Sequence, residues 1–250
     1  MDWMKKEIKR VMLVYPNQRW YKYDLTTTWN LSPYMLCLLA AMLQDKYEIK
    51  IVDAQFYNMS EEQFGKEVQD FKPDCVGISV LSSEYASILD TAAAIVKKIN
   101  KDIVTIAGGV HVTTQYYRVL ENKDIDYAVR GEGEYVLRDF LAYLNGEGTF
   151  PEKGIVFRNE NGGVPALPLD LVQALDALPL PNYDLVDYPA YTNTGPRYGV
   201  DSVHIYPYAR LLTSRGCYVG CSFCQVESIS GKKWRMRSAE KVIDELTFLK

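Results

Sequence analysis

The sequence lacks several features that would each indicate a class of protein. Its longest apolar stretch, around Leu36 to Leu43, is far too short to span a bilayer. The N-terminal segment MDWMKKEIKR lacks the apolar core of a signal peptide. The formal net charge is only -4, which gives no overall attraction to nucleic acid or to an anionic membrane. We therefore expect a cytoplasmic protein with no membrane span and no nucleic-acid partner.

Two nucleotide-binding motifs are also missing. No GxGxxG follows the first apolar run, and GxxxxGK[ST] occurs nowhere in the chain. Their absence argues against a nicotinamide site and against a nucleoside-triphosphate site.

The five cysteines are unevenly distributed, which argues for a reducing compartment rather than a disulfide framework. Cys217, Cys221 and Cys224 lie within TSRGCYVGCSFCQ at Cx3Cx2C spacing. Thiolates are soft ligands that select iron–sulfur clusters, zinc or copper. Three thiolates leave one iron of a four-iron cluster open to a small molecule. Cys37 and Cys75 lie inside apolar runs and are expected to be small core residues.

A zinc site is the alternative for the cysteine cluster. It would need a fourth ligand, and His204 is the nearest candidate. Zinc sites usually pair two cysteines with a second pair further on, and this chain has no second pair.

The first part of the chain alternates between strand and helix patterns. The helix over 60–71 opens with Ser60 and Gln63 at capping-box spacing. Short apolar runs predict strands over 11–15, 47–52, 75–80, 103–107 and 125–129, and helical periodicity predicts helices over 33–44, 60–71, 85–100, 112–120 and 134–144. This order predicts an α/β fold, a Rossmann-like doubly wound parallel sheet covered on both faces. Its ligand site is expected at the carboxyl ends of the strands.

The rest of the chain is expected to be less regular. Asn161-Gly162-Gly163, between Ile155–Phe157 and the stretch near Val164, predicts a hairpin. Six prolines between 165 and 196 predict an extended connector. A strand over 208–213 and a helix capped by Ser238 then flank the cysteine loop. We divide the chain into a Rossmann-like domain (1–148), a hairpin and proline-rich linker (149–200) and a third unit (201–250).

The cysteine loop resembles that of the radical S-adenosylmethionine (SAM) superfamily. Thr213 to Gly216 lead into it, Phe223 precedes the last cysteine, and GKKWRMRS follows. The resemblance implies that Cys217, Cys221 and Cys224 hold a [4Fe–4S] cluster whose open iron chelates SAM. It also implies that Phe223 packs near the adenine. One-electron reduction, from an external donor such as flavodoxin or ferredoxin, would then cleave SAM to a 5′-deoxyadenosyl radical.

A complete (β/α)8 barrel takes about 250 residues, whereas this chain ends at Lys250 within a helical pattern that has no stop signal. We therefore expect an N-terminal fragment that ends in the first β-α unit of a truncated radical SAM barrel.

A Rossmann-like domain before such a loop resembles the cobalamin (B12)-binding radical SAM proteins. Ser79-Val80-Leu81 fits the SxL signature of that fold, and Gly108-Gly109 fits its GG signature. Small residues here would leave room for the nucleotide tail, and the Ser79 hydroxyl could bond the dimethylbenzimidazole nitrogen. The DxHxxG signature is missing, because PNQRWYKYDL after the first strand has no histidine, which leaves the lower axial ligand open. His111 is either a contact to the tail or a histidine at a helix start.

Several charged residues have two interpretations. Gly131-Glu132-Gly133-Glu134 is either a turn with an acidic first helical turn, which we favour, or a close approach to a ligand. Asp53 is an ordinary strand-end residue or a ribose contact, and we favour the former. Arg215 and Arg235 either balance the charge of an anionic ligand or are surface charges. The basic stretch of Lys232, Lys233, Arg235 and Arg237 is interpreted as a solvated loop rather than an RNA contact, because only Trp234 is interleaved with it.

The resemblance implies an enzyme, methyltransferase-like, that starts radical chemistry on a small-molecule substrate, with ring formation or methylthiolation as variants. Two other functions stay open: a cobalamin-binding module without catalysis in this chain, and a zinc-stapled interaction protein.

Overall fold

A computed structural model describes residues 7–21, 32–83, 86–165, 167–193 and 207–250 of the 250. His204, the candidate zinc ligand, lies outside the described residues.

A six-stranded sheet forms the centre of the molecule, in the order β2-β1-β3-β4-β5-β6. The first five strands are parallel, as the five apolar runs predict, and β6 pairs antiparallel with β5. The strands are β1 (Arg10–Tyr15), β2 (Glu48–Asp53), β3 (Cys75–Ser79), β4 (Val104–Gly108), β5 (Tyr127–Val129) and β6 (Ile155–Phe157). The central strands are mostly apolar because helices cover both of their faces.

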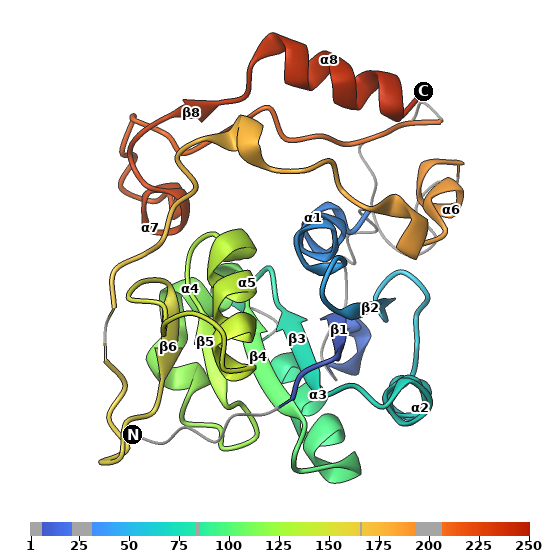
Figure 1. Cartoon of the computed structure of the whole chain (residues 1–250), viewed down its shortest axis with the longest axis vertical. Coiled ribbons are helices and arrows are strands. Elements are labelled where there is room, and N and C mark those ends of the chain that lie inside the picture. Colours follow the sequence, from blue (N-terminus) through green and yellow to red (C-terminus); the bar gives the residue numbers. More distant parts are fainter. Residues whose placement is uncertain (1–6, 22–31, 84–85, 166, 194–206) are drawn as a thin grey trace.

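Helices cover the two faces of the sheet as predicted (Figure 1). One face packs against α1 (Tyr34–Leu43) and α5 (Gly133–Leu144). The other packs against α2 (Glu61–Phe71), α3 (Ala86–Ile99) and α4 (Val110–Val119). Cys37 and Cys75 are fully buried core residues.

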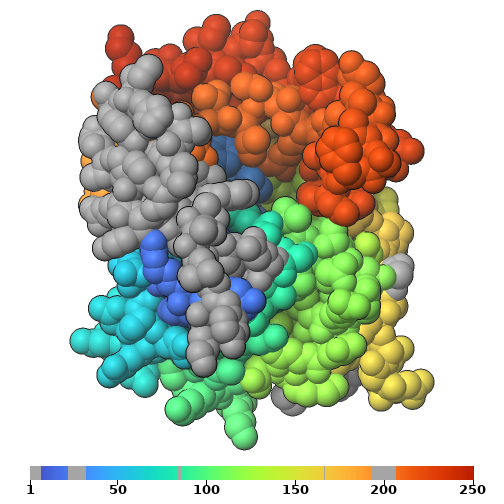
Figure 2. All heavy atoms as spheres, turned by 180° about the vertical axis from the view of Figure 1, so that it is seen from behind, coloured from blue at the N-terminus to red at the C-terminus, as the bar shows by residue number. Residues whose placement is uncertain are grey.

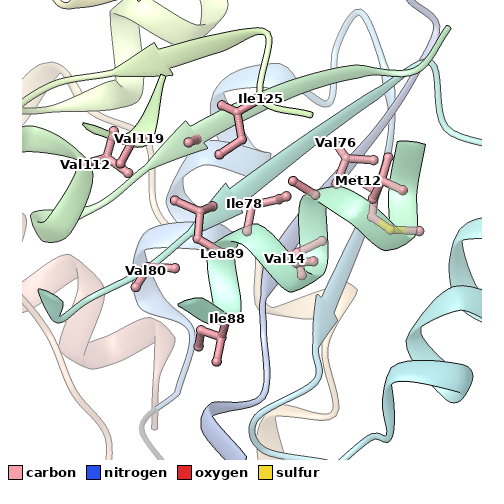
Figure 3. Packing of buried hydrophobic residues seen from close by; sticks show 14 of the residues in the cluster. Met12, Val14, Val76, Ile78, Val80, Ile88, Leu89, Val112, Val119 and Ile125 are labelled. Carbon is pink, nitrogen blue, oxygen red and sulfur yellow. The ribbon is translucent and has the colours of Figure 1, made fainter. Parts of the chain in front are cut away.

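The core on the second face is shown in Figure 3. Side chains of β1 and β3, among them Met12, Val14, Val76 and Ile78, meet Ile88 and Leu89 of α3. The predicted capping box is present at the start of α2, where Ser60 Oγ accepts the Gln63 N–H and Gln63 Oε1 accepts the Ser60 N–H.

Two local predictions were wrong. The chain does turn at Asn161-Gly162-Gly163, with the Asn159 N–H bonded to the Gly163 carbonyl, but no strand follows at Val164 and β6 pairs with β5 instead. The segment 208–213 is not a strand. The strand in this region is β7 (Ser214–Arg215), which pairs antiparallel with β8 (Arg235–Met236) in a separate two-stranded sheet.

The connector is mostly irregular, as the prolines predict, with short 3-10 turns η3 (Leu175–Ala177) and η4 (Tyr183–Leu185) and the helix α6 (Tyr188–Asn193). Beyond it, α7 (Val226–Ser230) follows the cysteine loop, and Ser238 caps α8 (Ala239–Phe248) as predicted. Within the described ranges, no helix has the length and apolar character needed to cross a membrane.

Candidate functional site

A cavity of about 450 Å³ lies where β3 and β4 end. It brings together four of the predicted cobalamin residues, Ser79, Leu81, Gly108 and Gly109. Arg215 and Gly216, which precede the first cysteine, form part of its wall, together with Val226 and Ile229 of α7. The two cobalamin signatures and the segment that leads into the cysteine loop therefore line the same cavity. The sequence alone did not suggest that α7 would form part of its wall.

The two glycines at the end of β4, Gly108 and Gly109, serve different purposes. Gly109 has φ +98°, and a Cβ there would lie 2.4 Å from the Val80 carbonyl oxygen, so only glycine fits. At Gly108, by contrast, there is room for a side chain, because a Cβ there would meet nothing within 4 Å. Gly109 thus lets the chain pass close to the end of β3, and Gly108 leaves open space in the cavity.

His111 does not line this cavity. It lies in the first turn of α4, is 7% exposed, and its Nδ1 is 3.0 Å from Ser83 Oγ. Burial lowers its pKa, with Asp90 opposing the shift. This position fits the second interpretation, a histidine at a helix start, and the contact of His111 to a nucleotide tail stays a prediction.

The cysteine loop lies at the surface. Cys221 and Cys224 are exposed, Cys217 is partly buried, and Phe223 is 87% exposed. The loop is a tight turn in which the Cys224 N–H donates to the Cys221 carbonyl over 3.0 Å. Among the described residues, no three His, Cys, Asp or Glu side chains converge as metal ligands. The donor set itself, three thiols on one short turn, suits an iron–sulfur cluster.

Arg215 joins the cysteine segment to the sheet domain through buried ion pairs. Its Nη2 lies 2.5 Å from Glu134 Oε1, and its Nη1 lies 3.4 Å from Glu132 Oε2. The side chains of Glu134 and Arg215 are 0% and 9% exposed. A pair shielded from water in this way is lost only at a high cost in stability.

Arg235, on β8, makes a second buried pair with the same segment. Its Nη1 and Nη2 each lie 2.7 Å from one oxygen of Glu132, a bidentate arrangement. It also donates to the carbonyls of Val172 and Ser230, and the Val172 N–H donates to Glu132 Oε2. The carboxylate of Glu132, in the sheet domain, therefore contacts both the linker, at Val172, and β8 beyond the cysteine loop, at Arg235.

These contacts correct two interpretations. Arg215 and Arg235 are neither surface charges nor free to balance an anionic ligand, because both are committed to buried glutamates. Glu132 and Glu134 are more than an acidic first turn, because they bind these arginines across the chain.

The solvated-loop interpretation of the basic stretch is correct for Lys232, which is exposed and pairs with Glu227 over 3.0 Å. It is wrong for Arg235 and Arg237, whose side chains are largely buried in ion pairs with Glu132 and Glu245.

Asp53 is a buried strand-end residue, as favoured from the sequence. Its Oδ1 accepts the Phe56 N–H over 2.9 Å, and its Oδ2 accepts the Tyr191 hydroxyl over 3.0 Å. Burial raises its pKa to about 6, although these hydrogen bonds oppose the shift. Tyr191 comes from α6, so a carboxylate of the sheet also fixes the linker.

The chain is similar to known proteins that are consistent with this site. Residues 26–141 match the family model of the B12 binding domain. The chain is 33% identical over 247 residues to an uncharacterized methyltransferase, PH0819, of Pyrococcus horikoshii, covering 98% of this chain and 51% of the relative. It is 28% identical to cytidylyl-2-hydroxyethylphosphonate methyltransferase of Streptomyces wedmorensis, covering 98% and 53%. The chain thus spans about half the length of these relatives.

Two solved structures share the fold. The radical SAM methyltransferase TsrM of Kitasatospora setae, with cobalamin and a [4Fe-4S] cluster bound, matches with a TM-score of 0.69 at 22% identity, over 97% of this chain and 47% of that chain. The cobalamin-dependent SAM radical enzyme OxsB, with aqua-cobalamin bound, matches with a TM-score of 0.74 at 22% identity, over 97% and 32%. The chain thus contains a segment that matches the B12 binding domain, and it shares the fold of two solved radical SAM enzymes with cobalamin bound.

Proposed function

We propose that the protein is a cobalamin-dependent radical SAM enzyme, methyltransferase-like, acting on a small-molecule substrate. The observation that carries the proposal is the wall of the 450 Å³ cavity, which contains both cobalamin signatures and the two residues before Cys217. Its relatives PH0819 and the Streptomyces wedmorensis enzyme are both called methyltransferases.

The chain's own residues would hold the cofactors. Cys217, Cys221 and Cys224 would bind a [4Fe–4S] cluster, and Phe223 would pack near the adenine of SAM. Ser79 would bond the nucleotide tail of cobalamin in the space left by Gly108, where a Cβ meets nothing within 4 Å. When bound, these groups supply one-electron and methyl-transfer chemistry. An external donor such as flavodoxin or ferredoxin would supply the electron.

The two buried arginines have a positioning part in this proposal. They fix the segments on either side of the cysteine loop, β7 and β8, to Glu132 and Glu134 beside the cavity. We propose the domain division 1–148, 149–200 and 201–250, with the last unit held on the first by these pairs.

Loading experiments separate this function from its alternatives. The chain is reconstituted without oxygen with iron, sulfide and hydroxocobalamin, desalted, and analysed for iron, cobalt and zinc. We expect about four irons per chain and bound cobalamin. Cobalamin without iron supports a binding module, zinc without iron supports a zinc-stapled protein, and no retained cobalamin contradicts the cobalamin assignment.

Two variants serve as controls for each other. Cys221→Ala should lose iron and keep cobalamin, because Cys221 is exposed and does not line the cavity. Gly108→Leu should lose cobalamin and keep iron, because its side chain fills the cavity. Unchanged iron in Cys221→Ala would contradict the ligand assignment.

A further inference from the structure

A second cavity, of about 500 Å³, adjoins the first. Tyr15, Met35, Ser79, Leu81 and Leu212 line both cavities, so the two are neighbouring compartments. The compartments differ in character. The first is bounded by the two glycines at the end of β4. The second is bounded by polar residues at or beyond the ends of β1 and β2, namely Gln18, Ser32, Asp53 and Gln55.

The second compartment contains buried polar groups without partners. Gln55 is 6% exposed, and its Oε1 accepts the Gln18 N–H over 2.7 Å. Gln55 Nε2, Gln18 Oε1 and Ser32 Oγ are buried and have no hydrogen-bond partner among the residues that the structure describes. Leaving such a group unpaired is destabilising, so buried polar groups normally have a hydrogen-bond partner. The carboxylate of Asp53, which also lines this compartment, already accepts hydrogen bonds from the Phe56 N–H and the Tyr191 hydroxyl.

The unpaired groups define the chemistry of a ligand. Gln55 Nε2 is a donor and Gln18 Oε1 is an acceptor. The side chain of Gln55 bonds the backbone of Gln18, so both belong to one patch of the wall. A primary carboxamide complements such a pair, because its carbonyl accepts and its NH2 group donates. A carboxylate does not, because it has only acceptors to present to Gln18 Oε1.

We propose that this compartment binds primary carboxamide groups at the rim of the corrin ring. The inference rests on the proposed function, in which cobalamin is bound, and adds residues that none of the signatures contains. The nucleotide tail then occupies the compartment beside Gly108, and the amide-bearing ring edge lies against Gln55 and Gln18. The loop after β1, which lacks the DxHxxG histidine, takes part through Gln18.

Gln55→Glu tests this assignment with little change in shape. It keeps the oxygen that accepts the Gln18 N–H and replaces the unpaired donor with an acceptor. Absorbance titrations compare hydroxocobalamin with cobinamide, which has the corrin amides but no nucleotide tail. We expect Gln55→Glu to bind both about tenfold more weakly or worse. Gly108→Leu should weaken cobalamin only, and Gln69→Glu, the same change on the exposed face of α2, should alter neither.

A ligand-side measurement is independent of how the variants fold. Cobyrinic acid, which carries carboxylates in place of the amides, should bind the unchanged protein at least tenfold more weakly than cobinamide. Equal binding of these two corrinoids, or unaltered affinities in a folded Gln55→Glu variant, would overturn the inference. If the unchanged protein binds neither cobalamin nor cobinamide, the proposed function fails, and this inference fails with it.

Discussion

Glu134 and Arg215 form a buried ion pair between residues that lie 81 positions apart in the chain, with Oε1 and Nη2 2.5 Å apart. Glu134 is in the first turn of α5, in the sheet domain, and Arg215 lies two residues before the first cysteine of the loop. The pair therefore connects the cavity wall directly to the cysteine segment.

Glu134→Gln should destabilise the protein markedly. It leaves the Arg215 guanidinium buried with only the more distant Glu132 as a partner, and breaking a buried pair costs about 3–5 kcal/mol. Denaturant unfolding measures this loss. Hydrogen exchange should also show faster exchange in β7 and β8, because their link to α5 is weakened.

The exposed pair of Arg138 and Asp139 gives the control, since its side chains are 44% and 50% exposed. Asp139→Asn should change the free energy of unfolding by no more than about 0.5 kcal/mol. Similar small effects for Asp139→Asn and Glu134→Gln would contradict the structural importance of the buried pair.

The adjacent glycines at the end of β4, Gly108 and Gly109, should respond differently to the same substitution. Gly109→Ala forces a side chain into φ +98° and onto the Val80 carbonyl, so we expect a loss of about 3 kcal/mol in stability. Gly108→Ala has open space and should fold as stably as the unchanged protein. Thermal unfolding of the two variants checks this, and equal stability would show that the turn is wrongly described.

The five cysteines should divide into two reactivity groups. Cys37 and Cys75 are fully buried, and burial, with a contribution from Asp53, raises the pKa of Cys37 to about 12. Thiolate is the reactive form, so both should resist alkylation until the protein unfolds. Cys217, Cys221 and Cys224 lie in the surface loop and should react in the native metal-free chain.

Mass spectrometry after a short exposure to iodoacetamide counts the labelled thiols. Iron loading should protect the three loop cysteines together and leave the buried two unchanged. Labelling of the loop cysteines that is indifferent to iron would contradict their assignment as ligands.

Asp53 should make stability depend on pH between its unfolded pKa, near 4, and its folded pKa, about 6. The folded state holds the proton more tightly in this window, so this carboxyl lowers stability as pH rises through it. As pH falls from 7.5 to 5, the free energy of unfolding of the unchanged protein should therefore increase relative to that of Asp53→Asn. A difference that stays constant would show that burial does not raise this pKa.

The sheet could be predicted from the sequence because its central parallel strands are mostly apolar on both faces. Each apolar run from Val11 to Val129 therefore stands out between helical patterns. The partner of β6 could not be predicted. Ile155–Phe157 has the pattern of a strand whether it pairs with β5 or with the stretch near Val164, and the turn at Asn161 favoured the second pairing, which does not form.

The cavity wall was predicted in part. Ser79 and Gly108 end neighbouring strands, so parallel pairing alone brings them together, and their Cα atoms are paired in register. The bonds of Arg215 and Arg235 to Glu132 and Glu134 span 81 and 103 residues. No local spacing connects charges at such separations, and charged residues are mostly exposed, so the sequence favoured solvated or ligand-facing positions. Figure 2 shows the C-terminal segment, in orange and red, lying against the sheet domain that these pairs reach.

Electron paramagnetic resonance of the iron-loaded, reduced chain, prepared without oxygen, tests most directly whether Cys217, Cys221 and Cys224 hold a cluster with one iron open to SAM. We predict a cluster signal that changes shape when SAM is added, because SAM would bind the open iron. No signal after reduction, or a signal that is identical with and without SAM, would contradict the account.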